Sequence, residues 1–264
     1  MVQEILTICI QVSREAGKLI LDLAKQPRQI EKKSAFDLVT DADKAASDLI
    51  TKRLLELMPD SQVMSEEDPS FALRATAGTL LWIVDPIDGT TNYARGIPHA
   101  AVSIAAYDSG KKELLVGCVL NPFNQECFWA AKNQGAFLNG ERIHVSQVSK
   151  LEDAIATTGY FNHEGLTYEN SNIPETYEFL KRCLGLRRNG AASLDLCWVA
   201  MGRLDVYWEK GLKAWDMAAG ALIVEESGGL VTNYRGEKLN LFEGSLLATN
   251  RLLHLESTQL LNQK

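Results

Sequence analysis

Apolar residues recur every three or four positions along the first part of the chain. The recurring positions are Ile5, Cys9, Val12, Ala16, Leu19 and Leu23. This spacing predicts an amphipathic helix, which we expect to end before Pro27. A second helix is predicted after Thr40, because Thr40 with Asp43 three residues later is typical of a capping box, and this helix should stop before Pro59.

Short apolar runs between turn residues predict strands in the rest of the first half. Residues 80–84 form the clearest run, and we expect this buried strand to end abruptly at Asp85-Pro86, with Pro86 ending the pairing. Further strands are predicted over residues 101–107 and 115–120. Residues 127–145 are expected to form a hairpin with Asn139-Gly140 at its turn.

The second half mixes predicted strands and helices. Strands are expected near residues 154–158, 204–208, 230 and 246, and helices over about 175–184, 193–201 and 216–227 and from about 253. Gly228-Gly229 is typical of the C-terminus of a helix, here the one over 216–227. Because the elements do not alternate strictly as strand, helix and strand, we predict an α+β fold of layered helices and mixed sheets.

The chain has 264 residues, which suits one large domain or two closely fused lobes. No internal repeat, low-complexity tract or obvious linker divides it. We therefore expect a single domain over residues 1–264, with an N-terminal lobe over about 1–148 and a C-terminal lobe over about 149–264.

Charge and cysteine usage narrow the class of protein. The formal net charge is −7, so a nonspecific grip on nucleic acid or on an anionic membrane is not expected. Arg187-Arg188 is the one basic pair to consider for recognition, and a solvated or dimer-facing pair is the alternative interpretation. Five scattered cysteines without a CxxC pair, no signal-peptide pattern and no run of roughly twenty apolar residues favour a soluble, cytoplasmic protein with reduced thiols.

The most informative segment is acidic and follows the predicted strand over 80–84. Asp85 and Asp88 lie three residues apart with the carbonyl of Ile87 between them, and such oxygen ligands can bridge hard cations. Gly89 and Thr90 come next, and their backbone N–H groups could bind a phosphate if a helix starts there. The alternative is an ordinary acidic turn, since Asp-Pro and Asp-Gly are common in turns.

Three other acidic segments carry the same ambiguity. Glu66 lies in an acidic stretch over 65–68, whose plain interpretation is a solvated loop. Asp43 ends another acidic turn over 37–43, where the helix cap is sufficient explanation. Asp216 stands at the start of an apolar helix, and a cap is again the alternative.

Taken together and in this order, the segments resemble the inositol monophosphatase family of lithium-sensitive, magnesium-dependent phosphatases. Residues 85–92, Asp-Pro-Ile-Asp-Gly-Thr-Thr-Asn, resemble its first signature, and residues 215–220, Trp-Asp-Met-Ala-Ala-Gly, resemble its second. The likeness covers essentially the whole chain. It implies a layered αβαβα sandwich and a phosphatase that uses two or three Mg²⁺ ions at each site.

The resemblance also implies a role for each matched position. Glu66, Asp85 and the Ile87 carbonyl would hold one metal, Asp85, Asp88 and Asp216 would hold the second, and Glu66 with water would hold a third, weaker one. Thr90 and Glu66, supported by Asp43, would orient and deprotonate the attacking water. The substrate would contact Asp88, Gly89, Thr90, Ala192, Glu209 and Asp216, with the Gly89 and Thr90 amides on phosphate and Glu209 on polyol hydroxyls.

This chemistry suits the residues. Mg²⁺ ions neutralise phosphoryl oxygens, lower the pKa of bound water and stabilise a leaving alkoxide, and a sparse all-oxygen ligand set is what Mg²⁺ prefers. No His/Cys cluster suggests zinc. A covalent phosphoenzyme is not expected, because the four histidines are scattered and no activated nucleophile is evident.

The departures from the family pattern affect the substrate. Lys213 stands where the animal enzymes carry histidine, the basic residue near the first acidic segment is either Lys32 or Lys33, and the segment after Ala154 matches loosely. Inositol 1-phosphate is the leading substrate, and fructose-bisphosphatase, histidinol-phosphate and phosphoadenosine-phosphate activities are the alternatives. A binding scaffold for a protein or RNA complex that retains the pocket is the alternative of another class. The resemblance further implies a homodimer with each site built within one subunit.

Overall fold

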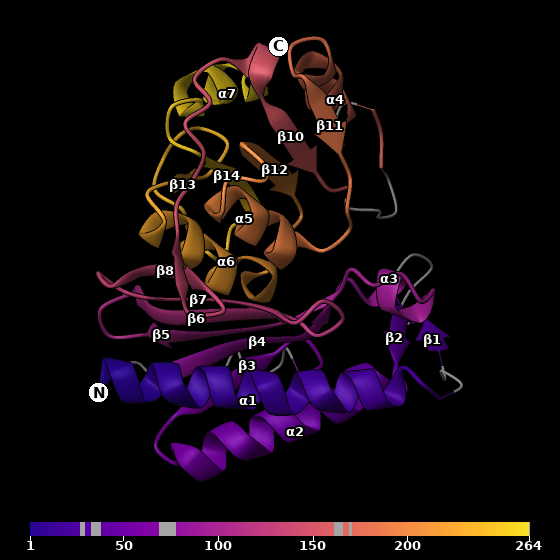
Figure 1. Cartoon of the computed structure of the whole chain (residues 1–264), viewed down its shortest axis with the longest axis vertical. Helices are drawn as coiled ribbons and strands as arrows, with labels where there is room; N and C mark the ends of the chain where they lie inside the picture. Colours follow the sequence, from indigo (N-terminus) through magenta and orange to yellow (C-terminus); the bar gives the residue numbers. More distant parts are fainter. Residues whose placement is uncertain (27–29, 33–37, 69–77, 161–165, 169–170, 264) are drawn as a thin grey trace.

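A computed structural model of the chain describes residues 1–26, 30–32, 38–68, 78–160, 166–168 and 171–263. Helices and sheets stack in five layers (Figure 1). Two long helices form one outer layer, a seven-stranded sheet the next, two helices the middle, a five-stranded sheet the fourth, and two short helices the last. The predicted αβαβα sandwich of the α+β class is confirmed.

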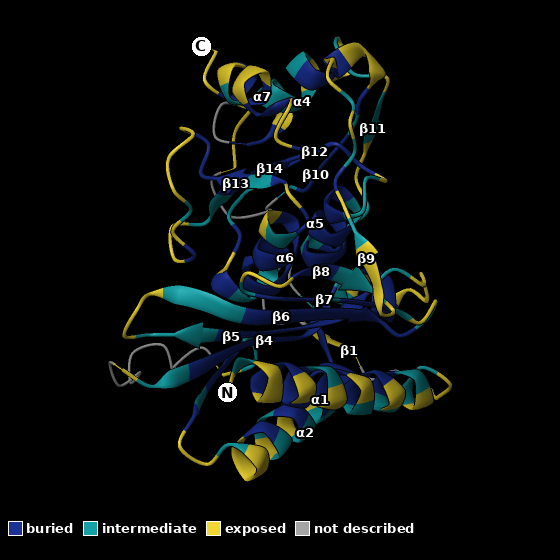
Figure 2. Ribbon diagram, turned by 60° about the vertical axis from the view of Figure 1, so that its left-hand side comes forward, coloured by how far each residue is buried: buried dark blue, intermediate teal, exposed yellow. Residues whose placement is uncertain are grey.

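The large sheet has the order β3-β4-β5-β6-β7-β8-β9, and its neighbouring strands are antiparallel except for the parallel pair β3 and β4. The strands are β3 (Gln62–Ser65), β4 (Leu80–Asp88), β5 (Ala101–Asp108), β6 (Glu113–Asn121), β7 (Glu126–Ala131), β8 (Gly135–Leu138) and β9 (Glu141–Ile143). Helices α1 (Val2–Leu23) and α2 (Asp41–Leu57) cover one face of it, with their buried sides toward the sheet (Figure 2).

The small sheet has the order β11-β10-β12-β14-β13 and mixes parallel and antiparallel pairs. Its strands are β10 (Ile155–Thr158), β11 (Gly185–Arg187), β12 (Val206–Lys210), β13 (Leu230–Thr232) and β14 (Ser245–Thr249). Helices α4 (Ile173–Leu180) and α7 (His254–Leu261) lie on its outer face (Figure 1). Shorter elements are a β1 (Ile30–Lys32) and β2 (Leu38–Thr40) pair, α3 (Thr90–Ala94) and the 3-10 turn η2 (Leu151–Asp153).

Helices α5 (Ala192–Ala200) and α6 (Ala214–Glu226) form the middle layer and are apolar nearly all round, because both sheets cover them. Two glycines allow this close packing. A Cβ at Gly220 of α6 would lie 2.6 Å from the Leu196 side chain, and one at Gly117 of β6 would lie 2.8 Å from the Ala219 carbonyl oxygen. The large and small sheets are therefore joined through one continuous core.

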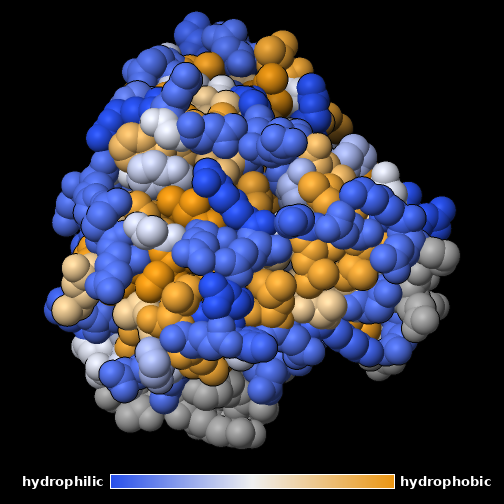
Figure 3. All heavy atoms as spheres, turned by 60° about the horizontal axis from the view of Figure 1, so that its bottom comes forward, coloured by the Kyte–Doolittle hydropathy of each residue, from blue (hydrophilic) through white to orange (hydrophobic). Residues whose placement is uncertain are grey.

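The outer surface is mixed in character. Hydrophilic residues cover much of the face seen in Figure 3, and hydrophobic residues show between them. No helix among the described residues is long and apolar enough to cross a membrane. The division into an N-terminal and a C-terminal lobe stays a prediction.

Several local predictions are confirmed. Thr40 caps α2 in a capping box with Asp43, Asn139 and Gly140 form the left-handed turn between β8 and β9, and Gly228, with a φ of 95°, follows the end of α6. Helix α1 ends at Leu23, and Pro27 lies outside the described residues.

Two predictions are wrong in detail. Strand β4 does not end at Asp85-Pro86 but continues to Asp88, because the chain bulges at Pro86 and Ile87 and then resumes pairing with β5. Residues 127–145 do not form one hairpin, since β7, β8 and β9 form a three-stranded meander there. The sequence interpretation missed β3, α3, β11 and the β1–β2 pair.

Candidate active site

The bulge at the end of β4 presents the first pair of acids. Asp85 pairs with Ser103 and Asp88 with Ala101, so Pro86 and Ile87 are the extra residues between two ladder positions. Proline has no N–H to give to the ladder, and the Ile87 N–H donates to Asp85 Oδ1 over 3.0 Å instead. The bulge therefore brings both carboxylates and the Ile87 carbonyl to one edge of the sheet.

Two further acids join this pair. Glu66 follows β3, and its N–H donates to the Val84 carbonyl over 3.1 Å, which carries the parallel pairing of β3 and β4 to the end of the strand. Asp216 lies in the first turn of α6 and accepts a hydrogen bond of 2.6 Å from the Lys213 N–H. Burial, followed by repulsion from Glu66, Asp88 and Asp216, raises the pKa of Asp85 well above its usual value. Asp85 is thus repelled by each of the other three carboxylates.

Asp88 is held by the start of α5. The Ala192 N–H lies 3.2 Å from Asp88 Oδ1, and the Ser193 N–H and hydroxyl lie 2.7 and 2.5 Å from Asp88 Oδ2. Burial raises the pKa of Asp88, while the Ser193 hydroxyl and amide favour its ionised form. Sequence interpretation missed Ser193, whose hydroxyl stands in an otherwise apolar helix.

Thr90 connects the bulge to α2. Its hydroxyl lies 3.1 Å from Asp43 Oδ1 and 3.0 Å from the Ile87 carbonyl oxygen. Asp43 Oδ2 accepts hydrogen bonds from the Thr40 N–H and hydroxyl, and burial raises the pKa of Asp43. The residue that caps α2 therefore also contacts the candidate site, so the cap and the functional interpretations of Asp43 are compatible.

Gly89 makes a close approach that a side chain would obstruct. Its φ is 89°, and a Cβ there would lie 3.1 Å from the carbonyl oxygens of Gly190 and His99. Helix α3 begins directly after it at Thr90. A helix therefore does start beside Asp88, which is the condition for phosphate binding by the Gly89 and Thr90 amides, although α3 has only five residues.

A cavity of about 160 Å³ lies beside these residues. It is lined by Asp88, Gly159, Arg188, Gly190, Ala191, Ala192, Asp195, Glu209, Leu212 and Asp216. Burial raises the pKa of Glu209 to about 7, and the Tyr207 hydroxyl donates to Glu209 Oε2 over 2.7 Å. The structure therefore brings Asp88, Ala192, Glu209 and Asp216 together around one space.

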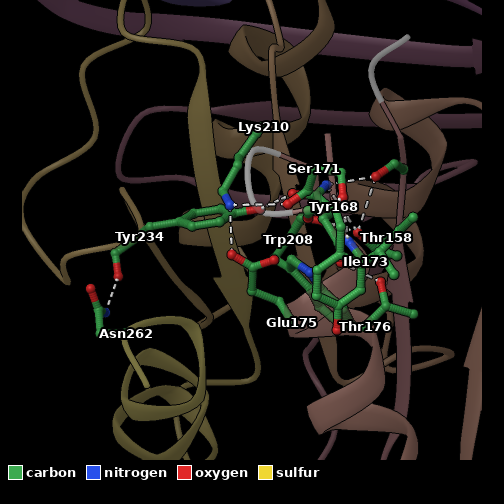
Figure 4. A network of polar contacts seen from close by, with 12 residues as sticks. Thr158, Tyr168, Ser171, Ile173, Glu175, Thr176, Trp208, Lys210, Tyr234 and Asn262 are labelled. Carbon is green, nitrogen blue, oxygen red and sulfur yellow. Dashed lines mark hydrogen bonds and ion pairs between the residues drawn. The ribbon is translucent and has the colours of Figure 1, made fainter. Parts of the chain in front are cut away.

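A polar network includes Glu175, Lys210 and Tyr234 (Figure 4). It also contacts Gly159, one of the residues that line the cavity. Asn172 Nδ2 donates to the Gly159 carbonyl over 2.6 Å, and Tyr234 donates to Asn172 Oδ1 over 3.0 Å. Lys210 lies over the Tyr234 ring and pairs with Glu175 of α4 at 2.5 Å. The network joins β10, β12 and α4, and a Cβ at Gly159 would meet Glu209 Oε2 at 1.9 Å.

The oxygen atoms of the acidic residues and of the Ile87 carbonyl suit a hard cation as ligands. Among the described residues no three His, Cys, Asp or Glu side chains are grouped closely enough to hold a metal as they stand. Four mutually repelling carboxylates and a backbone carbonyl are nevertheless the ligand chemistry of Mg²⁺ and Ca²⁺. Glu66, Asp85, the Ile87 carbonyl, Asp88 and Asp216 are the groups that would hold such a cation, and its charge would offset the repulsion among the carboxylates.

The basic residues singled out in the sequence differ in where they lie. Lys33 and Asp37 lie outside the described residues, so the choice between Lys32 and Lys33 is a prediction still. Lys213, which stands in place of a histidine, is exposed at the N-cap of α6. Of the basic pair, Arg188 lines the cavity and Arg187 does not.

Comparisons with known proteins find relatives that match nearly the whole chain. An inositol-1-monophosphatase of Synechocystis is 40% identical over 257 residues, which are 97% of this chain and 88% of that protein. The Nus factor SuhB of Pseudomonas aeruginosa is 40% identical over 251 residues, 94% of this chain and 92% of that protein.

A solved structure of an IMPase from Thermotoga maritima superimposes with a TM-score of 0.85 at 34% identity, covering 96% of this chain and 94% of that one. The sequence model of the inositol monophosphatase family matches residues 1–264. Such membership supports a phosphatase that depends on divalent metal ions. The chain belongs to the inositol monophosphatase family.

Proposed function

We propose that this protein hydrolyses myo-inositol 1-phosphate to inositol and phosphate in the cytoplasm, with Mg²⁺ as its metal. The observation that carries the proposal is that Asp88 and Asp216 line the same cavity as Glu209 and Ala192. The two carboxylates that we assign to metal ions, Asp88 and Asp216, thus face the same small cavity as Glu209, the carboxylate that we assign to ring hydroxyls. A phosphate ester of a polyol needs both kinds of contact.

The metal ligands we propose are Glu66, Asp85, the Ile87 carbonyl, Asp88 and Asp216. When bound, two or three Mg²⁺ ions would neutralise the phosphoryl oxygens and lower the pKa of the attacking water. Glu66, Asp88 and Asp216 all raise the pKa of Asp85 by repulsion, and Asp85 is our candidate for a ligand shared by two ions.

The chain's own residues hold the water and the ester. Thr90 and Glu66 would orient the attacking water and accept its proton. The Thr90 hydroxyl is hydrogen-bonded to Asp43, which would support this role. The Gly89 and Thr90 amides would bind phosphate oxygens, Glu209 would accept hydrogen bonds from ring hydroxyls, and the Ala192 backbone would contact the ring. In-line attack then breaks the P–O ester bond, and the inositol oxygen leaves and takes up a proton.

A substrate panel tests the proposal. Phosphate release would be measured on inositol 1-phosphate, fructose 1,6-bisphosphate, histidinol phosphate and phosphoadenosine phosphate, first with Mg²⁺ and then with EDTA. We expect inositol 1-phosphate to have the highest kcat/KM, EDTA to abolish turnover, and millimolar Li⁺ to inhibit it. Full activity in excess EDTA would refute the metal site.

Two variants separate metal binding from polyol binding. Asp88→Asn should depress kcat on every ester, because it replaces a negatively charged carboxylate at a proposed metal-ligand position with a neutral amide. Glu209→Gln should act through KM and change the ranking of substrates, since a contact made equally in ground and transition states appears in KM. An equal loss of kcat on all esters in Glu209→Gln would show that its role is wrongly assigned.

A second candidate function is a role in a larger assembly, because relatives 38–40% identical over more than 90% of this chain carry the name Nus factor SuhB. Such a role would not require turnover. Asp88→Asn should then support it in cells as wild type does, whereas a phosphatase role would be lost in the same variant.

A further inference from the structure

We propose that a second cavity, separate from the candidate active site, binds a small aromatic molecule that carries one negatively charged group. The cavity has a volume of about 790 Å³, and among the described residues it shares no lining residue with the smaller cavity beside Asp88. Its walls come from the β5–β6 hairpin, the β7–β8 turn, the second half of α6 and residues 238–242. The inference does not depend on the proposed function, because it uses none of the residues that we assign to the phosphatase.

The least exposed part of the lining is apolar. Ala221 and Leu222 of α6 and Leu241 of the loop before β14 are buried, and all three line the cavity. Tyr107 and Phe242 add two aromatic rings, whose centroids lie 6.5 Å apart in an edge-to-face arrangement. Phe242 is 58% exposed, so part of its ring is open to a ligand. An aromatic ring that packs here would remove this apolar surface from water.

The charged groups of the lining are three lysines and three glutamates: Lys112, Lys132, Lys238, Glu113, Glu225 and Glu226. Three of the six already have direct partners. Lys132 pairs with Glu113, and Glu226 accepts the N–H groups of Asn133 and Gly135 over 2.7 and 2.8 Å. In the part of the chain that the structure describes, no ion pair or side-chain hydrogen bond holds Lys112, Lys238 or Glu225.

The balance of these three groups favours a ligand with a single negative charge. Burial, followed by repulsion from Glu226, raises the pKa of Glu225, and the charges of Lys238 and Lys132 oppose this rise. Glu225 therefore offsets one of the two lysines that have no direct partner, and one positive charge is left over. A carboxylate or sulfonate group supplies the matching charge, and the aromatic part of the same molecule suits the rings of Tyr107 and Phe242.

The loop that contributes Phe242 is held in place without a ligand. The Phe242 N–H donates to Asn240 Oδ1 over 3.1 Å. Further along the loop, the Gly244 carbonyl accepts the N–H groups of Gly211 and Leu212 over 2.7 and 3.2 Å. Because the backbone of this wall is already fixed, only the lysine side chains have to be ordered when a ligand binds, which limits the conformational entropy that is lost.

Two dyes that differ only in charge test the proposal. Anilinonaphthalenesulfonate has aromatic rings and one sulfonate, and N-phenylnaphthylamine has the same rings without the sulfonate. Each would be titrated by fluorescence into the wild-type protein with Mg²⁺, with and without inositol 1-phosphate. We expect the sulfonate dye to bind about tenfold more tightly than the neutral dye, because its bonds to lysine are charge-assisted. We also expect inositol 1-phosphate not to displace it, because the two cavities are separate.

Three variants identify the groups that bind the dye. The double variant Lys112→Gln with Lys238→Gln should weaken binding of the sulfonate dye about tenfold and leave the neutral dye unchanged. Phe242→Ala should weaken both dyes, because both stack on its ring. Lys111→Gln is the matched control, since Lys111 precedes Lys112 in the chain but pairs with Asp108 and does not line the cavity.

Each of several results would overturn the proposal. These are no binding of the sulfonate dye to wild type, equal affinity for the two dyes, unchanged affinity in the double lysine variant, an equal loss in Lys111→Gln, and displacement by inositol 1-phosphate. None of them bears on hydrolysis of inositol 1-phosphate, which would be measured separately. Thermal unfolding would verify that each variant folds, which we expect because Lys112, Lys238 and Phe242 are exposed.

Discussion

Ser193 binds the same oxygen of Asp88 twice, through its N–H at 2.7 Å and its hydroxyl at 2.5 Å. The two residues are 105 positions apart in sequence, and the contact joins the end of β4 to the first turn of α5. Because Asp88 is proposed as a metal ligand, Ser193 would help to fix the orientation of that carboxylate. Partners of this kind orient a ligand and tune its affinity.

Ser193→Ala should weaken apparent Mg²⁺ affinity and lower kcat/KM on every ester. A hydrogen bond to a charged group contributes about 1.5–3 kcal/mol, so we expect roughly a tenfold loss or more. Activity titrated against Mg²⁺ is the measurement. Ser227→Ala is the control, because the Ser227 hydroxyl is equally buried but donates to the Val224 carbonyl at the far end of α6. Equal Mg²⁺ curves for Ser193→Ala and wild type would remove Ser193 from the site.

Gly159→Ala should raise KM for inositol 1-phosphate with little change in the unfolding temperature. Its Cβ would meet the Glu209 carboxylate at 1.9 Å, and that carboxylate would have to leave its position. Asn172→Ala should have the same effect more weakly, since it frees the Gly159 carbonyl. Gly185→Ala in the same sheet is the control, because its Cβ would meet only the flexible end of Arg187. A KM unchanged in both Gly159→Ala and Asn172→Ala would contradict the prediction.

The buried imidazole of His254 should make the free energy of unfolding depend on pH. Its two ring nitrogens lie 3.0 Å from the hydroxyls of Thr232 and Thr249, and burial lowers its pKa to about 4. Below about pH 6.5 the unfolded chain takes up a proton that the folded imidazole refuses until about pH 4, so stability falls as pH drops across this window. The loss has an upper bound of about 3 kcal/mol.

Thermal unfolding in EDTA between pH 7.5 and 5 would measure this loss. His254→Gln should lower stability at pH 7.5 but show a smaller further fall at pH 5 than wild type does. The exposed His144→Gln should keep the wild-type dependence. Parallel curves for wild type and His254→Gln would show that His254 carries no proton linkage.

Local patterns in the sequence were enough for most elements. The Thr40–Asp43 capping box and the Asn139–Gly140 turn depend on residues a few positions apart, and both form as predicted. The end of β4 was misjudged because resumption of pairing at Asp88 depends on Ala101 in β5, which no local pattern encodes. Strand β3 was missed because it is short, and it is a strand only by virtue of its neighbour β4.

Local sequence patterns likewise identified some residues of the site and missed others. Asp85, Asp88 and Asp216 could be selected because they stand in two sequence signatures. Ser193 and Arg188 could not, since one sits in an apolar helix and the other in a basic pair with a solvated alternative. Only the packing of α5 against the end of β4 brings Ser193 to Asp88, and only the folding of Arg188 across Gly190 brings it to the cavity.

The hydroxyl of Thr90 has one proton and two acceptors, Asp43 Oδ1 at 3.1 Å and the Ile87 carbonyl at 3.0 Å. If the Ile87 carbonyl ligates a metal, it becomes the weaker acceptor because the metal draws electron density from its oxygen, and the Thr90 proton goes to the Asp43 carboxylate. The free lone pair of Thr90 can then accept a hydrogen bond from the attacking water. Asp43 therefore acts on the water through Thr90, which makes it a positioning residue.

This arrangement predicts that Thr90 and Asp43 act as one unit. Thr90→Ala and Asp43→Asn should each lower kcat by roughly a hundredfold with little change in KM, in the range typical of proton transfer groups. The double variant should lose little more than either single one, because each already breaks the same contact. Thr91→Ala, an exposed neighbour in α3, should keep wild-type turnover. Single-turnover rates at saturating Mg²⁺ would measure the cycle, and independent losses that multiply in the double variant would mean that Asp43 serves only to cap α2.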